Sequence, residues 1–358
     1  MGRKRERVLT ALMMFPQISE IAYEFCSTRT AVPTLSPIRK MNPPAARSPS
    51  SWLMSKPYFL LSLTSLFWAG NVVLGRFVAG KIPPMTLSFI RWSAAFLIVL
   101  PFAWKYLAKD WFAIRNQLGL MVVLSFTGIA TFNCLGYWSL QYTQALNALL
   151  LQSSGPLFVA LFALLLFGIR LTLAQAIGIV ISMAGVFVIL MRGDVETLSS
   201  IQFNKGDVGY TLALAIFGLY SALAAKRPLI HPLSFLAFTT GCGALFIIPL
   251  IAWEIGNGET MTVSVTTMAA LVYVAIFPST LAYLFFNRGI ELIGPNRAAP
   301  FFHLIPVFGS VLAIVFLGER PQLFHIVGYA LVLAGVFIAA RRASAASSGN
   351  PVEPAPPT

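Results

Sequence analysis

Few side chains in this sequence could do chemistry, because most charged residues lie outside ten long apolar runs. Arg91 is the main exception, since it lies within the apolar run 85–104, roughly 9 Å in at 1.5 Å per helical residue. A buried guanidinium must face a cavity or a partner rather than lipid. We therefore predict that Arg91 contacts the carboxylate of an anionic or zwitterionic substrate. The alternative is a structural partner, such as helix-end carbonyls or nearby aromatic rings.

His303 is the second residue of this kind. It lies near the centre of an apolar run, whereas His231 lies in a loop and His325 near the end of a run. The ordinary pKa of imidazole, about 6.5, lies close to physiological pH. His303 could therefore take up and release a proton during a functional cycle. The alternative is a neutral imidazole that only hydrogen-bonds a neighbouring helix.

Further lining residues of the predicted substrate site are mostly uncharged polar side chains within the apolar runs. Asn or Gln in lipid costs too much to be left unpaired. Such side chains therefore line a cavity or form bonds between packed helices, and the sequence leaves both interpretations open. Besides Arg91 and His303, the predicted substrate-binding set consists of Trp68, Asn71, Asn133, Gln152, Ser153, Ser221 and Tyr283.

An internal duplication positions these residues. Residues 148–170 recur as 298–320, and the register continues without a gap to residues 187 and 337, with twelve identities at an offset of 150 residues. Such periodic self-similarity indicates a repeated architecture. The same offset pairs Asn71 with Ser221, Asn133 with Tyr283, Gln152 with Phe302, and Ser153 with His303.

Prolines and glycines recur in the same register. Pro156 and Pro306 lie inside their runs, where a proline removes a backbone hydrogen bond and kinks the helix. We predict kinks that expose backbone carbonyls to a substrate, or static kinks that only shape the packing. Glycines at 178, 185, 328 and 335 form a smooth stripe. The stripe predicts close helix packing, with a homodimer as the alternative.

The composition indicates a membrane protein. The 358 residues are 57% hydrophobic and 10% charged, with a mean hydropathy of +0.78, whereas soluble domains carry about 25% charged residues. Apolar runs of roughly 20 residues are long enough to span a bilayer. We therefore predict an all-α integral membrane protein with ten transmembrane helices, and not a large soluble helical protein. The formal charge of +13 is dispersed over tails and short loops, which argues against nucleic acid as a partner.

Five runs per copy is an odd number, so the second copy enters the membrane from the opposite side. The prediction is two inverted five-helix repeats. If the N-terminus is cytoplasmic, eleven Lys and Arg residues flank the inner ends of the runs and four flank the outer ends. The positive-inside rule then places both termini in the cytoplasm and the multi-pass chain in the cytoplasmic membrane.

The sequence divides into five predicted segments. Residues 54–191 and 207–342 are the two five-helix repeats, and residues 192–206 form a linker loop. Residues 1–53 are a disordered extension or a misassigned start, with Met54 as the natural beginning, and 343–358 are a disordered tail. A signal peptide is the alternative for the N-terminus, although its apolar patch is short and no cleavage pattern follows closely.

The sequence carries no catalytic or cofactor motif. It has no Walker loop, metal-ligand helix or nucleophile elbow, and its three cysteines lack disulfide or metal spacing. All twelve acidic residues lie in tails, loops or the edges of runs, which disfavours proton transfer through a buried carboxylate. We predict neither an enzyme, nor a metal site, nor a cofactor.

Several short motifs resemble the drug/metabolite transporter superfamily, and within it the EamA family of ten-helix carriers. These motifs are FWAGN at 67–71, FIRW at 89–92, the serine-proline segment 153–156, LGER at 317–320 and the GYALVLAGVFI close at 328–338. The resemblance covers about residues 58–342 and implies secondary transport, usually efflux of amino acids, other small metabolites or drugs. One departure is Ile169, which stands where Glu319 supplies an acidic residue in the second copy.

The predicted function is export of a small polar metabolite, such as an amino acid, a related compound or a drug, by alternating access about a mid-membrane site. The predicted partners are this small-molecule substrate and the lipid bilayer. One alternative is a sugar-phosphate or nucleotide-sugar carrier, although its phosphates would require several buried cations and only Arg91 is well placed. The other alternative is a membrane enzyme or assembly factor.

Overall fold

The computed structural model describes residues 54–168, 173–191, 204–293 and 298–347. Every regular element in these ranges is a helix, which confirms the predicted all-helical class. The predicted extension 1–53 and most of the linker lie outside the described residues. The last helix continues to Ser347, so residues 343–347 are helical and not part of a disordered tail. This stretch is rich in alanine, the strongest helix former.

The first half begins with two long helices, α4 (Pro57–Phe77) and α5 (Pro84–Asn116). Each begins with a proline, which lacks the backbone N–H that would have no partner at that position. The next stretch consists of α6 (Leu118–Leu124), the π-helix η1 (Ser125–Thr131) and α7 (Phe132–Leu140). It is followed by α8 (Ala145–Gln152), α9 (Gly155–Phe167) and α10 (Leu173–Leu190).

The second half has the same order of elements. It contains α12 (Lys205–Ala224), α13 (Pro232–Gly256), then α14 (Val265–Ile276), the π-helix η2 (Phe277–Leu281) and α15 (Ala282–Ile293). A 3-10 turn, η3 (Ala299–His303), precedes α17 (Leu304–Leu317) and α18 (Leu323–Ser347). The two π-helices overlap at the 150-residue offset, so the duplication includes this local irregularity of the backbone.

The described residues contain six helical stretches that are long and apolar enough to cross a membrane. The pair α8 and α9, bent by 44°, forms a seventh if it is taken as one broken span. Shorter apolar helices cover residues 176–189, 301–317 and 323–335. The number of ten spans stays a prediction.

The end of the first helix of one copy lies near the beginning of the first helix of the other. Arg76, at the end of α4, donates from Nη1 to the carbonyls of Leu140 and Gln141 at 2.9 and 3.0 Å. Gly206, at the beginning of α12, packs against the carbonyl of Ser139. The inverted orientation of the two copies stays a prediction.

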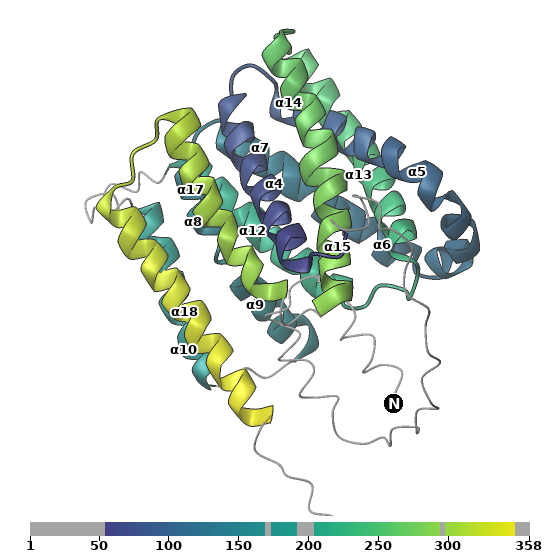
Figure 1. Cartoon of the computed structure of the whole chain (residues 1–358). Coiled ribbons are helices and arrows are strands. Elements are labelled where there is room, and N and C mark those ends of the chain that lie inside the picture. The colour runs from purple at the N-terminus through teal and green to yellow at the C-terminus, as the bar shows by residue number, and fades with distance from the viewer. Residues whose placement is uncertain (1–53, 169–172, 192–203, 294–297, 348–358) are drawn as a thin grey trace, which may run out of the picture.

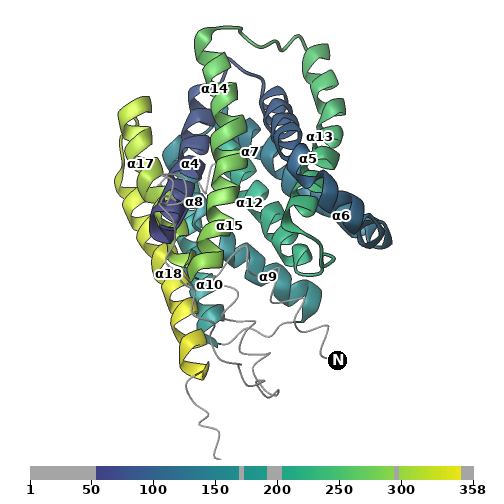
Figure 2. The ribbon, with the colours of Figure 1, turned by 45° about the vertical axis from the view of Figure 1, so that its right-hand side comes forward.

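Helices α10 and α18 pack side by side along one flank of the bundle, as Figures 1 and 2 both show. A Cβ atom at Gly185 would lie 2.6 Å from the Gly328 carbonyl, and one at Gly335 would collide with the carbonyl of Gly178. Only glycine allows the two backbones to come this close, so the predicted close packing is present. Because the stripe is used within the chain, it does not offer a surface for a homodimer.

Candidate functional site

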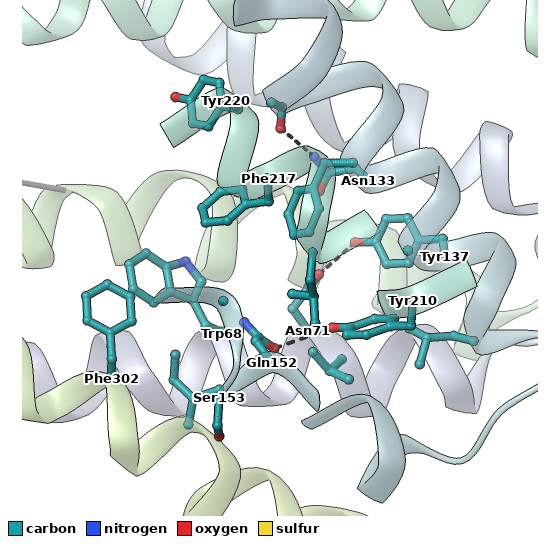
Figure 3. A pocket seen from close by; sticks show the side chains of 18 of the residues that line it. Trp68, Asn71, Asn133, Tyr137, Gln152, Ser153, Tyr210, Phe217, Tyr220 and Phe302 are labelled. Carbon is teal, nitrogen blue, oxygen red and sulfur yellow. Dashed lines mark hydrogen bonds between the residues drawn. The ribbon is translucent and has the colours of Figure 1, made fainter. Parts of the chain in front are cut away.

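A cavity of about 180 Å³ lies between the two halves of the chain. One water molecule needs about 10–15 Å³ of such space, so a small organic molecule has room here. Figure 3 shows side chains that line it, including Trp68 and Gln152. Eight of the nine predicted substrate residues line the cavity: Trp68, Asn71, Arg91, Asn133, Gln152, Ser153, Tyr283 and His303.

Ser221 is the exception, since it is not among the residues that line this cavity. Its hydroxyl donates to the carbonyl of Phe217, four residues earlier in α12, at 2.8 Å. Serine often bonds back to its own helix in this way. Ser221 is buried among packed helices and does not line the cavity. The packing role left open for such residues therefore holds for Ser221.

Two helix breaks border the cavity, one in each half. Helix α8 ends at Gln152 and α9 begins at Gly155, whereas η3 ends at His303 directly before α17. Ser153 and His303 thus occupy equivalent breaks at the 150-residue offset, and both line the cavity.

The two prolines have a different place from the one predicted. Pro156 is the second residue of α9, and Pro306 is the third residue of α17. Neither kinks the middle of a continuous helix; each lies in the first turn of the segment that follows the break, where a missing backbone N–H costs little. Both prolines also line the cavity.

Arg91 bridges the two halves from a buried position with 4% exposure. Its Nε donates to Ser279 Oγ in η2 at 2.7 Å, and its Nη1 donates to Asn133 Oδ1 and Tyr137 Oη in α7, both at 3.0 Å. The guanidinium carbon lies 4.4 Å from the centre of the Trp92 ring. Arg91 therefore has the structural partners that the sequence left as an alternative, although these are side chains rather than helix-end carbonyls.

Three of the five N–H groups of Arg91 are used in these bonds, and the two that remain are both on Nη2. No carboxylate in the described part of the chain forms an ion pair with Arg91, and the cavity lining contains no Asp or Glu. Burying a cation without a counter-charge is costly. The cavity therefore has a positive charge and unused donors at one point of its wall.

Arg91 is held by one side chain within a π-helix, Ser279 of η2, and by one just after the other π-helix, Asn133 at the beginning of α7. Asn133 donates from Nδ2 to the carbonyls of Gly128 and Ile129 in η1, at 3.2 and 2.9 Å. Ser279 Oγ donates to the carbonyl of Val274 at 2.7 Å. A π-helix displaces the usual backbone bonds, and such segments are frequent at functional sites. These two side chains satisfy backbone carbonyls near the wider turns and also accept bonds from Arg91.

Two tyrosines orient the remaining amides of the cavity wall. Tyr137 donates its hydroxyl to Asn71 Oδ1 at 2.7 Å, and Tyr210 donates to Gln152 Oε1 at 3.4 Å (Figure 3). Because the amide oxygens accept, the amide nitrogens of Asn71 and Gln152 remain as donors.

Two other lining residues have buried polar atoms without a partner. Trp92 Nε1 and Ser153 Oγ make no hydrogen bond within the described residues, although both are buried. Most buried polar atoms in proteins are paired. Both atoms have almost no accessible surface, so they lie behind the surface of the cavity.

The rest of the cavity wall is largely aromatic. Trp68 stacks on Phe302 with ring centres 5.3 Å apart, and it meets Phe286 at 5.4 Å and Tyr283 at 5.9 Å. The lining aromatic residues not included in the prediction are Trp92, Phe132, Tyr137, Tyr210, Phe217, Tyr220, Phe286 and Phe302. Helical spacing could have found some of them, since Tyr137 follows Asn133 by four residues and lies on the same face of α7.

Comparison with known proteins places the chain among transporters. A model of the EamA-like transporter family matches residues 55–191 and again residues 204–341. The uncharacterized transporter YyaM of Bacillus subtilis is 27% identical over 79% of this chain and 92% of its own length. A probable amino-acid metabolite efflux pump of Salmonella typhimurium is 26% identical over 79% of this chain and 94% of its own length. A probable terminal-alkyne amino-acid exporter of Streptantibioticus cattleyicolor is 26% identical over 63% of this chain and 74% of its own length.

A solved crystal structure shares the fold. It superimposes with a TM-score of 0.52 and covers 81% of this chain and 99% of its own, at 19% sequence identity. Two matches to one family model and a common helical fold agree with the duplicated architecture.

Proposed function

The chain belongs to the EamA-like transporter family, and we propose that it is a secondary transporter that exports small polar metabolites, such as amino acids and related compounds. The cavity between the two halves, bordered by one helix break from each, is the observation that supports this proposal. In inverted-repeat carriers, broken helices form the substrate site near the middle of the membrane. The relatives named as an amino-acid exporter and an amino-acid metabolite efflux pump favour this class of substrate.

Transport would proceed by alternating access, in which the two halves rock about the cavity. The chain would reside in the cytoplasmic membrane with ten spans and both termini in the cytoplasm. Labelling of single introduced cysteines tests this topology: positions 56 and 341 should react from the cytoplasm, and positions 205 and 320 from outside. Finding positions 170 and 320 on the same side would end the inverted-repeat proposal.

Counterflow in proteoliposomes tests transport itself. Liposomes that contain the purified full chain and are preloaded with an unlabelled amino acid should accumulate the same labelled amino acid. Ser153→Trp, which fills the cavity at a helix break, should abolish this uptake. Val180→Trp is the matched control, because Val180 lies on α10 outside the cavity and is 69% exposed. Exchange no faster than in empty liposomes, over a panel of amino acids and sugar phosphates, would contradict the proposal.

His303 is the proposed coupling residue, because it is the only histidine among the lining residues and lies at a helix break. Imidazole can accept a proton on one side of the membrane and release it on the other. His303→Gln retains hydrogen bonding but cannot titrate near neutral pH. This variant should still exchange substrate but lose the acceleration of net transport by a pH gradient. Full gradient-driven transport in the variant would exclude His303 as the coupling group.

A further inference from the structure

We propose that the cavity selects monocarboxylates whose remaining part is apolar, and that Arg91 binds the carboxylate group through Nη2. This substrate class rests on the proposed transport function and narrows it. Carboxylic acids with an apolar side group belong to it, whereas organic cations and phosphate esters do not.

The charge of the cavity wall sets the charge of the substrate. Arg91 is buried and the lining residues contain no Asp or Glu. A monoanion would balance the guanidinium, whereas a cation would add a second buried positive charge without a counter-charge. A dianionic phosphate would leave one negative charge unbalanced beside a single arginine. One carboxylate is therefore the best electrostatic match.

The unused hydrogen-bond donors of Arg91 determine which charged group it can bind. Two N–H groups remain on Arg91 Nη2, and Arg91 lines the cavity. A carboxylate has two acceptor oxygens and no donor, so it can accept both of these N–H groups. The amide nitrogens of Asn71 and Gln152 are further donors among the lining residues.

The aromatic part of the wall sets the rest of the substrate. Trp68 and Phe302 stack with their centres 5.3 Å apart, and Phe132 meets Phe217 at 4.8 Å. Such a wall gains free energy by burying apolar area of the substrate, and it favours rings through stacked or edge-to-face contacts. An apolar group of the substrate would therefore lie against these rings while its carboxylate faces Arg91.

Calorimetric titration of the full chain in detergent tests this assignment. The probes are 3-phenylpropanoate, its amide 3-phenylpropanamide, the amine 3-phenylpropylamine, the short acid propanoate and the phosphate ester phenyl phosphate. We expect the phenyl acid to bind at least about tenfold more tightly than the amide, which corresponds to about 1.4 kcal/mol. Propanoate should bind more weakly because it has no ring, and the amine should not bind.

Variants then assign the preference to Arg91. Arg91→Gln should bind the phenyl acid and the amide with nearly equal affinity, because the charge that distinguishes them is gone. Arg115→Gln is the matched control, since Arg115 is exposed in the last turn of the same helix, and it should keep the tenfold ratio. A tenfold ratio that persists in Arg91→Gln would overturn the role of Arg91.

The wild-type chain alone can also overturn the proposal, whether or not Arg91→Gln folds. Equal binding of the acid and the amide, or tighter binding of the amine or of phenyl phosphate, would contradict the substrate class.

Counterflow in proteoliposomes distinguishes a failure of this substrate class from a failure of the proposed transport function. Selective binding of the phenyl acid without exchange of any solute would leave the carboxylate site standing and contradict transport. Exchange of other solutes without a preference for the acid would contradict the substrate class alone.

Discussion

The two ends of the helical bundle differ in how the halves of the chain are joined. We call the end where α5, α8, α12 and α18 begin the carboxylate end, because Asp207, Glu254 and Glu319 of the second half bond there to the first half. At the 150-residue offset, the equivalent positions are Pro57, Trp104 and Ile169. The duplicated halves therefore share a backbone plan but close their two ends with different chemistry.

Two of these carboxylates cap helices of the other half. Glu254 accepts from the backbone N–H groups of Met85 and Thr86 at 2.7 and 2.9 Å, at the beginning of α5. Glu319 accepts from Ala145 and Leu146, both at 2.8 Å, at the beginning of α8. The first N–H groups of a helix have no partner within it, and a negative charge there is favourable. Each carboxylate thus joins the halves through a helix N-terminus.

Asp207 joins the halves through side chains instead. It is fully buried and accepts from the Thr143 hydroxyl and from Asn147 Nδ2, the latter at 3.0 and 3.1 Å. Asn147 Oδ1 lies 2.8 Å from His325 Nε2, and His325 Nδ1 accepts from the backbone of Gln322. The bond to Nδ1 places the proton of a neutral ring on Nε2, which therefore donates to Asn147.

Fewer bonds between the halves are found at the opposite end within the described residues. Asp110 accepts from the backbone N–H of His231 at 2.9 Å, and Ser65 donates to the carbonyl of Phe301 at 2.7 Å. Trp104, the equivalent of Glu254, is 64% exposed. Hydrogen bonds to charged groups contribute about 1.5–3 kcal/mol, more than neutral ones. Separating the halves should therefore cost more at the carboxylate end.

The largest effect is expected at Asp207. Asp207→Ala leaves the donors of Thr143 and Asn147 buried without an acceptor, so we expect the free energy of unfolding to fall by about 3 kcal/mol. Pro57→Ala is the matched change at the equivalent position and should cost less than about 1 kcal/mol, because Pro57 only begins α4. Thermal unfolding in detergent measures both. Equal loss of stability in the two variants would contradict the difference between the ends.

The sequence predicted most of the cavity but not the bonds around it. Polar residues within apolar runs, such as Arg91, Asn133 and His303, were predicted to line a cavity because lipid cannot satisfy such groups and a cavity can. The partners of Arg91 were not predictable, since Ser279 lies 188 residues away and meets it only through the packing of the two halves.

The burial of the acidic residues was also not predictable from the sequence. From the sequence, Asp207 and Glu254 lie at the edges of apolar runs, so the prediction disfavoured proton transfer through a buried carboxylate. In the structure they are 0% and 1% exposed. Position along a run gives the depth within one helix, but the burial of a side chain depends on the helices beside it. A buried carboxylate is therefore present, although it lies at one end of the bundle and not at the cavity.

An intermediate effect is expected at Glu254. Glu254→Ala leaves two N–H groups of α5 and the Thr86 hydroxyl without this acceptor, so we expect a loss of about 2 kcal/mol, at the upper end for a helix cap. Glu259→Ala removes an exposed carboxylate five residues further along the chain, after the end of α13, and should change stability by less than about 0.5 kcal/mol. A cysteine at position 85 should also be modified faster in Glu254→Ala, and an unchanged rate would argue against a role in closing this end.

The smallest effect is expected at Glu319, which is only half-buried. Glu319→Gln keeps one carbonyl oxygen, so one of the two N–H groups of α8 stays bonded while the favourable negative charge at the helix N-terminus is lost. We expect a loss of about 1 kcal/mol in thermal unfolding. The neighbouring Arg320→Gln is the control, since Arg320 is exposed and should contribute almost nothing.

Glu254 and Glu319 cap different helices and share no hydrogen-bond partner, so the double variant should lose the sum of the two single losses within about 0.5 kcal/mol. If the double variant is as stable as Glu254→Ala alone, the Glu319 cap must already be lost in the Glu254→Ala variant. The carboxylate end would then open as a single unit.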